Sequence, residues 1–538
     1  MQYGFIIDNR KCIGCHACTV ACKSEHDVAI GVNRTWVKQT EKGEFPNTRR
    51  VFSVLRCNHC SDAPCVEICP VEALFIRQDG IVDFNNDRCI GCKSCMQACP
   101  YDALYIDPDT HTAAKCNYCA HRVDIGLEPA CVNVCPEHAI ISGDIEDPNT
   151  EIAQLLAREQ VTVRKPEKGT RPNVYYIHGD EASLTPSATA RTDQYIWSSQ
   201  QGGVGHYAKF LDKIIAEKNP EELLAQLNPQ EISYAGSQKK SVEVLMEAAK
   251  ARRVYDTPDK GILWGWEVSA YILTKAVSAG VILVSFLAMF MLTDQEALGA
   301  DIKYVIGAIA LLFLGATGAL LVKDLDQPKR FIYVLLRPQW KSWLTKGGYA
   351  ITLFGGIVTC WLLAIYFNLD FLERASFALS AIMATVVAVY TAFLFAQAKG
   401  RDFWQSPMLV LHMMTHSIMA GTAALIVLNY FIPSTTAWVQ LNIYLLMGST
   451  LFNLALMLIE LTITHPTQDA KTVVSMIISG RYKMMFWMGT ILVGNLLPLL
   501  FLADVFNGLS IIAAFLSLVG IFITEKIWVE APQRIPLT

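Results

Sequence analysis

The pattern of apolar and polar residues changes near the middle of the chain. From about Ile262 onward apolar residues dominate, and charged residues are confined to short intervals. Eight of the apolar stretches reach the roughly 20 residues that a helix needs to cross a bilayer. The predicted spans are residues 262–292, 302–322, 347–367, 375–398, 407–432, 439–463, 484–503 and 508–527. Because these runs are rich in the Gly and Ala that allow close helix contact, they predict a membrane bundle rather than the core of a soluble enzyme.

The first half is more polar and contains an internal repeat. A Cys-Pro pair followed by a short helix and a β-like run occurs at residues 70–76, 100–106 and 136–141, and Cys-Ile-Gly-Cys occurs at 12–15 and 89–92. The predicted fold is therefore in two parts, an α+β unit that duplicates a two-cluster ferredoxin pattern and an all-α membrane bundle of eight helices. The predicted domains are residues 1–145, a connector over 146–258 with amphipathic helices near 206–218 and 238–253, and a membrane domain over 259–530.

Cysteine spacing carries the strongest chemical signal. Sixteen of the 17 cysteines precede residue 136, in four groups of four: Cys12, Cys15, Cys18, Cys22; Cys57, Cys60, Cys65, Cys69; Cys89, Cys92, Cys95, Cys99; and Cys116, Cys119, Cys131, Cys135. Groups one and three have the spacing C-x2-C-x2-C-x3-C, which sends three thiolates to one cluster and the fourth to another. Sixteen thiolates at four per cluster predict four [4Fe-4S] clusters.

Two other readings of these cysteines are weaker. Triplets spaced two residues apart pair poorly as disulfides, and we expect no secretory signal before Cys12. Zinc ribbons use isolated C-x2-C pairs, which only group four resembles. The remaining cysteine, Cys360, lies within the third span, where a free cysteine behaves as a small apolar residue.

The net charge and the absence of certain sequence motifs exclude some classes of function. A net charge of −4 over 538 residues, with no basic stretch interleaved with aromatic residues, predicts no nucleic-acid partner. The sequence has no dinucleotide fingerprint and no Ser-His-Asp arrangement. We therefore expect the site that converts substrate to lie in another chain.

The two halves resemble two known kinds of subunit. The first 145 residues are similar to the four-cluster electron-transfer subunits of molybdopterin oxidoreductases, of the dimethyl sulfoxide, polysulfide and nitrate reductase type. The membrane half resembles the NrfD/PsrC-type subunit of polysulfide reductase. Its most specific stretches are Asp324-Leu-Asp-Gln-Pro-Lys-Arg-Phe331, Arg337-Pro338, Ser342-Trp-Leu344, Tyr390-Thr-Ala392 and Trp404-Gln-Ser-Pro407.

The resemblance implies which cysteines share a cluster. Groups one and four would exchange ligands, as would groups two and three. The implied ligand sets are Cys12, Cys15, Cys18 with Cys135; Cys116, Cys119, Cys131 with Cys22; Cys57, Cys60, Cys65 with Cys99; and Cys89, Cys92, Cys95 with Cys69. It further implies that the Cys12 set faces a catalytic partner and the Cys22 set faces the membrane.

Polar residues within the spans gather in one leaflet. If the cysteine-rich half lies on one side, the side chains nearest it are Glu267, Tyr271 and Lys275 of span one, Tyr390 of span four, His412 and His416 of span five, and Glu460 of span six. Ionisable groups inside a membrane are costly and usually mark a site or a pathway. Their shared depth predicts a quinone site there.

Roles can be assigned to these residues. Tyr271 and Tyr390 could hold the carbonyls of menaquinone or ubiquinone, while Glu267, His412, His416 or Glu460 could pass protons. The alternative for each tyrosine is a membrane-interface anchor. Because His412 and His416 lie on one face of one helix, they cannot supply opposite ligands of one haem, and no haem is expected. Glu460 is a candidate partner for the ammonium of Lys275.

Charge in the loops predicts orientation. Eleven Lys and Arg residues lie in the three loops on the cysteine-rich side, against two on the other: Lys323, Lys329, Arg330, Arg337, Lys341, Lys346, Lys399, Arg401, Lys471, Arg481 and Lys483, against Lys303 and Arg374. The positive-inside rule then puts the clusters on the cytoplasmic face of a bacterial or archaeal inner membrane.

The sequence thus predicts a multi-pass, electron-transferring and quinone-reactive subunit of an oxidoreductase complex. It would link the quinone pool to a molybdopterin-type catalytic subunit or another soluble redox partner. One alternative is a quinol-oxidising respiratory subunit, with or without proton translocation, that passes electrons to a cytochrome. Another is a non-catalytic anchor or docking subunit.

Overall fold

The computed structural model describes residues 1–44, 46–189, 251–292, 299–432, 434–503 and 508–538. The chain forms two compact units. The first, here called the cysteine-rich unit, contains Met1–Leu263 together with Ala398–Gly400 and Pro536–Thr538. The second, here called the helical unit, contains Trp264–Gln397 and Arg401–Ile535.

A four-stranded mixed sheet lies at the centre of the cysteine-rich unit. Its strands are β1 (Tyr3–Asp8), β8 (Ile140–Asp144), β9 (Val161–Thr162) and β10 (Val174–Ile177). Their order is β8-β1-β10-β9, with β1 parallel to β10 and antiparallel to β8. Phe5 and Tyr176, both fully buried, pack in the core on this sheet. Apolar strands from before the first cysteine motif and after the last one thus pair in a single sheet.

The connector predicted over residues 146–258 differs from what the structure shows. Its described parts belong to the cysteine-rich unit, because β9 and β10 complete the central sheet and cannot leave it without breaking the pairing to β1. This stretch also holds α6 (Glu151–Arg158) and α7 (Glu181–Leu184). The helix expected at 206–218 and most of that at 238–253 lie outside the described residues. The end of the second, from residue 251, lies instead in the strand β11 (Ala251–Tyr255).

Smaller elements carry the cysteines. A second sheet has the order β11-β2-β3. Two hairpins, β4–β5 and β6–β7, follow the first two Cys-Pro pairs, and β8 follows the third, so all three predicted β-like runs are confirmed. The short helix predicted after each pair was wrong, because turns occupy residues 70–73, 100–103 and 136–139 and the short helices precede the pairs instead. The bounds are β2 (Thr35–Glu44), β3 (Asn47–Arg56), β4 (Leu74–Ile76), β5 (Val82–Phe84), β6 (Leu104–Ile106), β7 (Ala113–Lys115), α1 (Ala17–Glu25), α2 (Pro64–Ile68), α3 (Ser94–Ala98), α4 (Ala120–Val123) and α5 (Ala130–Asn133).

The repeat is also visible in the backbone of the two Cys-Ile-Gly-Cys turns. Gly14 and Gly91 both have φ near +70°, and the residues two positions later, His16 and Lys93, have φ of 62° and 60°. Glycine adopts this left-handed conformation without a steric penalty. The two halves therefore fold the same turn around their cysteines.

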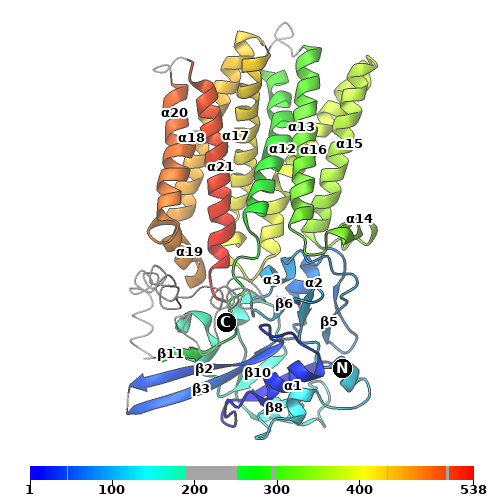
Figure 1. The fold of residues 1–538 in the computed structure, drawn as a ribbon, viewed down its shortest axis with the longest axis vertical. Helices are drawn as coiled ribbons and strands as arrows, with labels where there is room; N and C mark the ends of the chain where they lie inside the picture. The colour runs from blue at the N-terminus through cyan, green and yellow to red at the C-terminus, as the bar shows by residue number, and fades with distance from the viewer. Residues whose placement is uncertain (45, 190–250, 293–298, 433, 504–507) are drawn as a thin grey trace, which may run out of the picture. The chain divides into compact units, whose positions relative to one another are not determined.

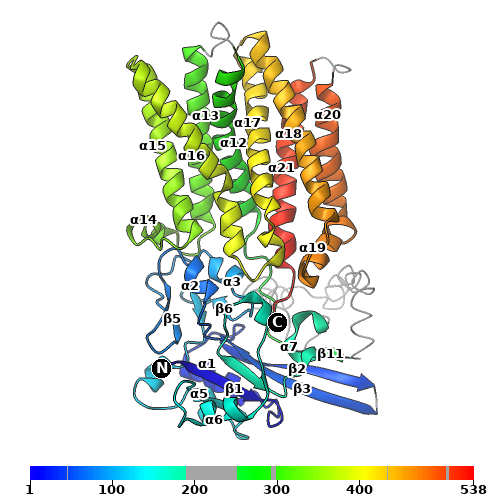
Figure 2. The ribbon, with the colours of Figure 1, turned by 180° about the vertical axis from the view of Figure 1, so that it is seen from behind.

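Eight membrane-length helices form the helical unit and confirm the eight predicted spans. Figures 1 and 2 show them running side by side. They are α12 (Trp266–Met291), α13 (Ala300–Lys323), α15 (Trp343–Tyr366), α16 (Asp370–Gln397), α17 (Met408–Phe431), α18 (Thr436–Thr462), a π-helix (Met485–Leu496) that continues into α20 (Leu497–Leu502), and α21 (Ser510–Gln533). Short helices α14 (Tyr333–Leu336) and α19 (Gln468–Ile478) lie between spans.

Helices α12 and α17 form the inner layer of this bundle. Both are two-thirds buried by the other helices, more than any other span. They approach so closely that a Cβ on Gly280 would meet the carbonyl of Ser417 and the backbone of Gly421. Small residues at the crossing let the two backbones touch. This contact brings the polar residues of spans one and five into the interior.

Candidate functional site: four cysteine sets and a buried polar cluster

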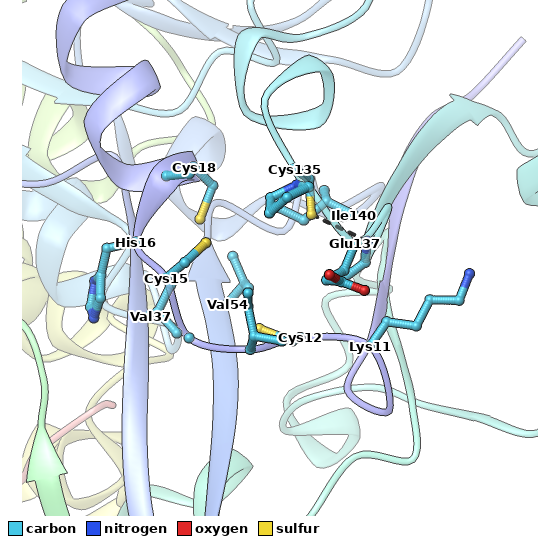
Figure 3. Close-up of a pocket in the computed structure, with 15 residues that line it drawn as sticks. Lys11, Cys12, Cys15, His16, Cys18, Val37, Val54, Cys135, Glu137 and Ile140 are labelled. Carbon is cyan, nitrogen blue, oxygen red and sulfur yellow. Dashed lines mark hydrogen bonds between the residues drawn. The ribbon is translucent and has the colours of Figure 1, made fainter.

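The first cysteine set surrounds one cavity. Cys12, Cys15, Cys18 and Cys135 line it, and Figure 3 shows their sulfur atoms turned toward a shared space. Cys18 comes from α1, whereas Cys135 follows α5, more than 100 residues later in the chain. The backbone N–H of Ala139 donates to Cys135 Sγ at 3.2 Å. Thiolate ligands of iron–sulfur clusters accept such hydrogen bonds.

The other twelve cysteines fall into three further sets whose thiols are close enough for their charges to interact. The Cys22 thiol interacts with those of Cys116, Cys119 and Cys131. The Cys65 thiol interacts with those of Cys57, Cys60 and Cys99. The Cys95 thiol interacts with those of Cys69, Cys89 and Cys92. These are the same four sets that the family resemblance implies.

No set is contracted around a single-ion position. Among the described residues, no three His, Cys, Asp or Glu side chains are placed to hold one metal ion. Burial raises the pKa of the Cys18 and Cys92 thiols to about 12, so without a metal they would be neutral thiols. Four thiols around a shared space fit a cubane cluster, which spaces its ligands farther apart than one zinc ion does and binds them as thiolates.

Contacts between sets define their order. The Cys18 thiol lies near Cys131, the Cys116 thiol near Cys57, and the Cys95 thiol near Cys65. The sets therefore follow one another as the Cys12, Cys22, Cys57 and Cys89 sets. The expectation that the Cys22 set forms the membrane-facing end was wrong, because this set has a neighbour on each side and lies in the interior of the row.

Cationic and neutral side chains surround the middle of this row. Arg56 Nη1 donates to Cys131 Sγ at 3.1 Å, and His26 Nε2 lies 3.1 Å from Cys119 Sγ. Burial, with the charges of Lys115 and Arg56, holds the pKa of His59 well below its usual range, so this imidazole is neutral. Hydrogen bonds and charge near the sulfurs are among the factors that set a cluster's potential.

A buried polar cluster lies between α12 and α16 in the helical unit. Lys275 Nζ donates to Thr391 Oγ1 at 2.6 Å and to the carbonyl of Ala388 at 3.2 Å, and it lies 4.6 Å from the centre of the Tyr390 ring. Tyr271, one turn before Lys275, also interacts with Tyr390 and Thr391. Tyr271, Lys275 and Tyr390 are each at most 4% exposed. The structure thus brings together three of the predicted residues.

Two histidine–carboxylate pairs lie beside each other on α17. His412 Nε2 is 2.9 Å from Glu460 of α18, as an ion-pair contact without an aligned hydrogen bond. The Trp528 indole donates to the same carboxylate at 3.2 Å. One turn along α17, His416 Nδ1 is 2.6 Å from Glu525 of α21. All four ionisable side chains are buried, so each pair can hold a proton away from solvent.

The partner suggested for Lys275 was wrong, since Glu460 contacts His412 and Lys275 is bound by Thr391 instead. Glu267, one turn before Tyr271 on α12, has a different partner. Its partly exposed carboxylate lies 3.7 Å from Lys323 Nζ at the end of α13.

Sequence reasoning missed Glu525. It lies near the predicted end of span eight, but α21 continues to Gln533, so the carboxylate is two turns inside the helix. A carboxylate in an apolar run was the signal that could have found it. Its charge also reaches Lys275 and Tyr271. Glu525 therefore contacts His416 and lies within electrostatic range of the α12–α16 cluster.

Amide side chains extend the His416 pair. His416 Nε2 lies 3.1 Å from Asn453 Oδ1, and Asn453 Nδ2 donates to Asn495 Oδ1 at 3.1 Å. Asn495 sits in the π-helix and donates to the carbonyl of Thr490, five residues earlier, at 2.7 Å. π-Helical turns are rare and often occur at functional sites. Here the widened turn brings Asn495 into the polar network.

Comparison with known families divides the chain at the same place. Residues 11–74 and 48–145 each match a 4Fe-4S dicluster domain, so this protein binds [4Fe-4S] clusters. Residues 257–533 match the family described as polysulphide reductase, NrfD. That match spans just over half of the 538 residues.

Curated relatives match about a third of the chain. A tetrathionate reductase subunit of Salmonella typhimurium is 46% identical over 201 residues, which are 36% of this chain and 80% of that protein. A polysulfide reductase subunit of Wolinella succinogenes is 41% identical over 181 residues, 33% of this chain and 94% of that protein. Protein NrfC of Escherichia coli is 42% identical over 180 residues, 33% and 81%. The chain therefore belongs to the polysulphide reductase NrfD family, as a multi-pass membrane protein fused to an iron–sulfur electron-transfer subunit.

Proposed function

We propose that four [4Fe-4S] clusters are held by the four cysteine sets described above. The grouping of sixteen thiols into four sets supports this number; all of them except that of Cys15 are buried or partly buried. When bound, such clusters supply one-electron transfer. The protein contributes thiolates, N–H donors such as that of Ala139, and buried cations beside the sulfurs. Iron and acid-labile sulfide analysis of the purified full-length protein tests the number: about sixteen iron atoms per molecule is the expected result.

The electrons reach a separate catalytic subunit at one end of their path. Relatives that match about a third of this chain have the names of tetrathionate and polysulfide reductase subunits, which supports a reductase partner. The family resemblance adds that this partner contains molybdopterin. Affinity purification of the tagged protein from native membranes should recover a molybdenum-containing subunit. Recovery of a multihaem cytochrome alone would favour the quinol-oxidising alternative.

A quinone meets the protein at Tyr271, Lys275 and Tyr390. These side chains offer two hydroxyl donors and one ammonium inside the bundle, which is the chemistry that a quinone's two carbonyls need. Because all three are buried, the headgroup binds by displacing packed side chains rather than by entering an open cleft. The clustering of three polar residues from two helices is the observation that carries this proposal.

Protons reach that site through the histidine pairs. Reduction of a quinone to a quinol consumes two electrons and two protons, and the reverse reaction releases them. His416 with Glu525, and His412 with Glu460, are buried groups able to exchange protons, and the charge of Glu525 reaches Lys275. Imidazole suits this role because its ordinary pKa is close to neutral pH, so it can both accept and release a proton.

Quinone-driven reoxidation of reduced clusters tests the proposed site. The purified protein is reduced, a short-chain quinone analogue is added, and the cluster absorbance is followed by stopped flow. Tyr271→Phe and Tyr390→Phe should each slow reoxidation at least tenfold. Tyr444→Phe is a matched control, because Tyr444 lies on α18 with 67% of its surface exposed. Wild-type rates in both pocket variants would place the quinone elsewhere.

The cysteine-rich unit lies on the cytoplasmic side. The excess of Lys and Arg in the loops on its side supports this orientation. A cysteine introduced at Asn368, between α15 and α16, should react with an impermeant maleimide added to intact cells, whereas one at Arg481, between α19 and the π-helix, should not. The opposite labelling would show that the unit faces the other compartment.

A further inference from the structure

Three cationic side chains of the cysteine-rich unit are fully buried, Lys38, Arg56 and Lys115, and the last two lie beside cysteine sets. Arg56, at the end of β3, and Lys115, at the end of β7, both have 0% of their surface exposed. Neither forms a salt bridge with a carboxylate in the part of the chain that the structure describes. A buried charge without a counter-charge costs several kcal/mol. These two residues therefore require another source of negative charge.

Arg56 lies where the first cysteine set meets the second. Its guanidinium donates to Cys131 Sγ, and its charge also acts on the thiols of Cys116 and Cys18. The group stacks over the Phe5 ring at 4.4 Å. Its Nε and Nη2 are buried and have no hydrogen-bond partner among the protein atoms that the structure describes. Two free donors thus lie beside the sulfurs of neighbouring sets.

Lys115 lies where the second set meets the third. Its ammonium donates to the carbonyl of Cys116 at 2.8 Å and to that of Val82. It is also within hydrogen-bonding reach of the Cys57 thiol, and its charge acts on Cys65 and Cys116. These three thiols belong to the second and third sets. The two cations therefore occupy successive junctions of the row.

We propose that Arg56 and Lys115 are the internal counter-charges of the cluster row and raise the reduction potentials of the clusters on either side of each. This inference rests on the proposed ligand sets. Adding an electron makes a cluster more negative, so a fixed cation in a low-dielectric interior favours the reduced form. The Cys22 set receives both charges, the Cys12 and Cys57 sets receive one each, and the Cys89 set receives neither.

This arrangement would shape the electron path. The interior clusters, those of the Cys22 and Cys57 sets, accept an electron more readily with the cations than without them. An electron that enters at one end of the row is therefore stabilised on these two clusters before it leaves at the other end. Both residues act through charge on the clusters and not by contact with substrate.

A redox titration monitored by electron paramagnetic resonance tests which midpoint potentials depend on each cation, and it does not require each signal to be assigned to a cluster. The wild-type protein in detergent should show four midpoint potentials, and fewer than four would count against the proposed ligand sets. Arg56→Gln should lower two midpoints and Lys115→Gln two, with one midpoint lowered by both and one by neither. The double variant should lower three. Each affected midpoint potential should fall by at least about 59 mV, which is a tenfold change in the one-electron equilibrium constant.

Conservative variants separate charge from packing. Arg56→Lys and Lys115→Arg should keep all four midpoints near wild type. Lys11→Gln is the matched control, because Lys11 precedes a ligand of the first set but is exposed, so water screens its charge. If Arg56→Gln cannot be loaded with iron whereas Arg56→Lys can, the result supports a need for positive charge at position 56 to hold the clusters. Shifts of Arg56→Lys as large as those of Arg56→Gln, or equal shifts of all four midpoints, would overturn the inference.

Discussion

Replacing Lys275 by methionine tests whether its ammonium is needed for the reaction with quinone or for the stability of the fold. The ammonium makes one short hydrogen bond to Thr391, a longer one to a carbonyl, and a cation–π contact with Tyr390. A hydrogen bond from a charged donor contributes about 1.5–3 kcal/mol, and a desolvated cation–π contact about 2 kcal/mol. Placing a lysine in the centre of a membrane helix costs about 2.5–3.5 kcal/mol. With the short hydrogen bond and the cation–π contact counted, the gain and the cost balance to within about 2 kcal/mol.

Lys275→Met should therefore leave stability within about 2 kcal/mol of wild type, because methionine fills a similar volume and the Thr391 hydroxyl can turn to a carbonyl of its own helix. Quinone-driven reoxidation of the clusters should fall at least tenfold. Thermal unfolding in detergent and stopped-flow reoxidation measure the two effects. Lys303→Met is the control, because that lysine pairs with Glu373 at a helix end and should change neither. A destabilisation of about 3–5 kcal/mol with a normal reoxidation rate would refute this reasoning.

Three further variants test the helical unit. Gly280→Val should lower stability by about 1–3 kcal/mol in thermal unfolding, because a side chain there meets the backbone of α17, whereas Gly315→Val, with nothing within 4 Å, should not; equal effects would refute the close contact. Glu525→Ala should destabilise by about 3–5 kcal/mol and slow proton-coupled quinone reduction, since it leaves His416 without its carboxylate; a wild-type melting curve would contradict the pairing. Cys360→Ala should keep the full iron content and reoxidation rate, and loss of iron would assign that thiol a role.

Local patterns account for much of this protein. The spacing of Cys12, Cys15 and Cys18 forces three thiols onto one turn and the start of one helix, and a run of about twenty apolar residues has few alternatives to a membrane helix. Both features are fixed by neighbours within a few positions. The spans and the three β-like runs after Cys-Pro were therefore predictable from sequence, and so was the family.

Long-range contacts were decided only by the tertiary structure. His416 and Glu525 are 109 residues apart, and nothing in either local sequence selects Glu525 over Glu460. The role of β10 in the central sheet, the interior position of the Cys22 set, and the burial of Arg56 between two sets depend likewise on how distant segments pack. Spacing specifies which atoms a short stretch can present. Which partner they meet depends on the free energy of the whole packed unit, where a buried charge must find a counter-charge wherever the fold provides one.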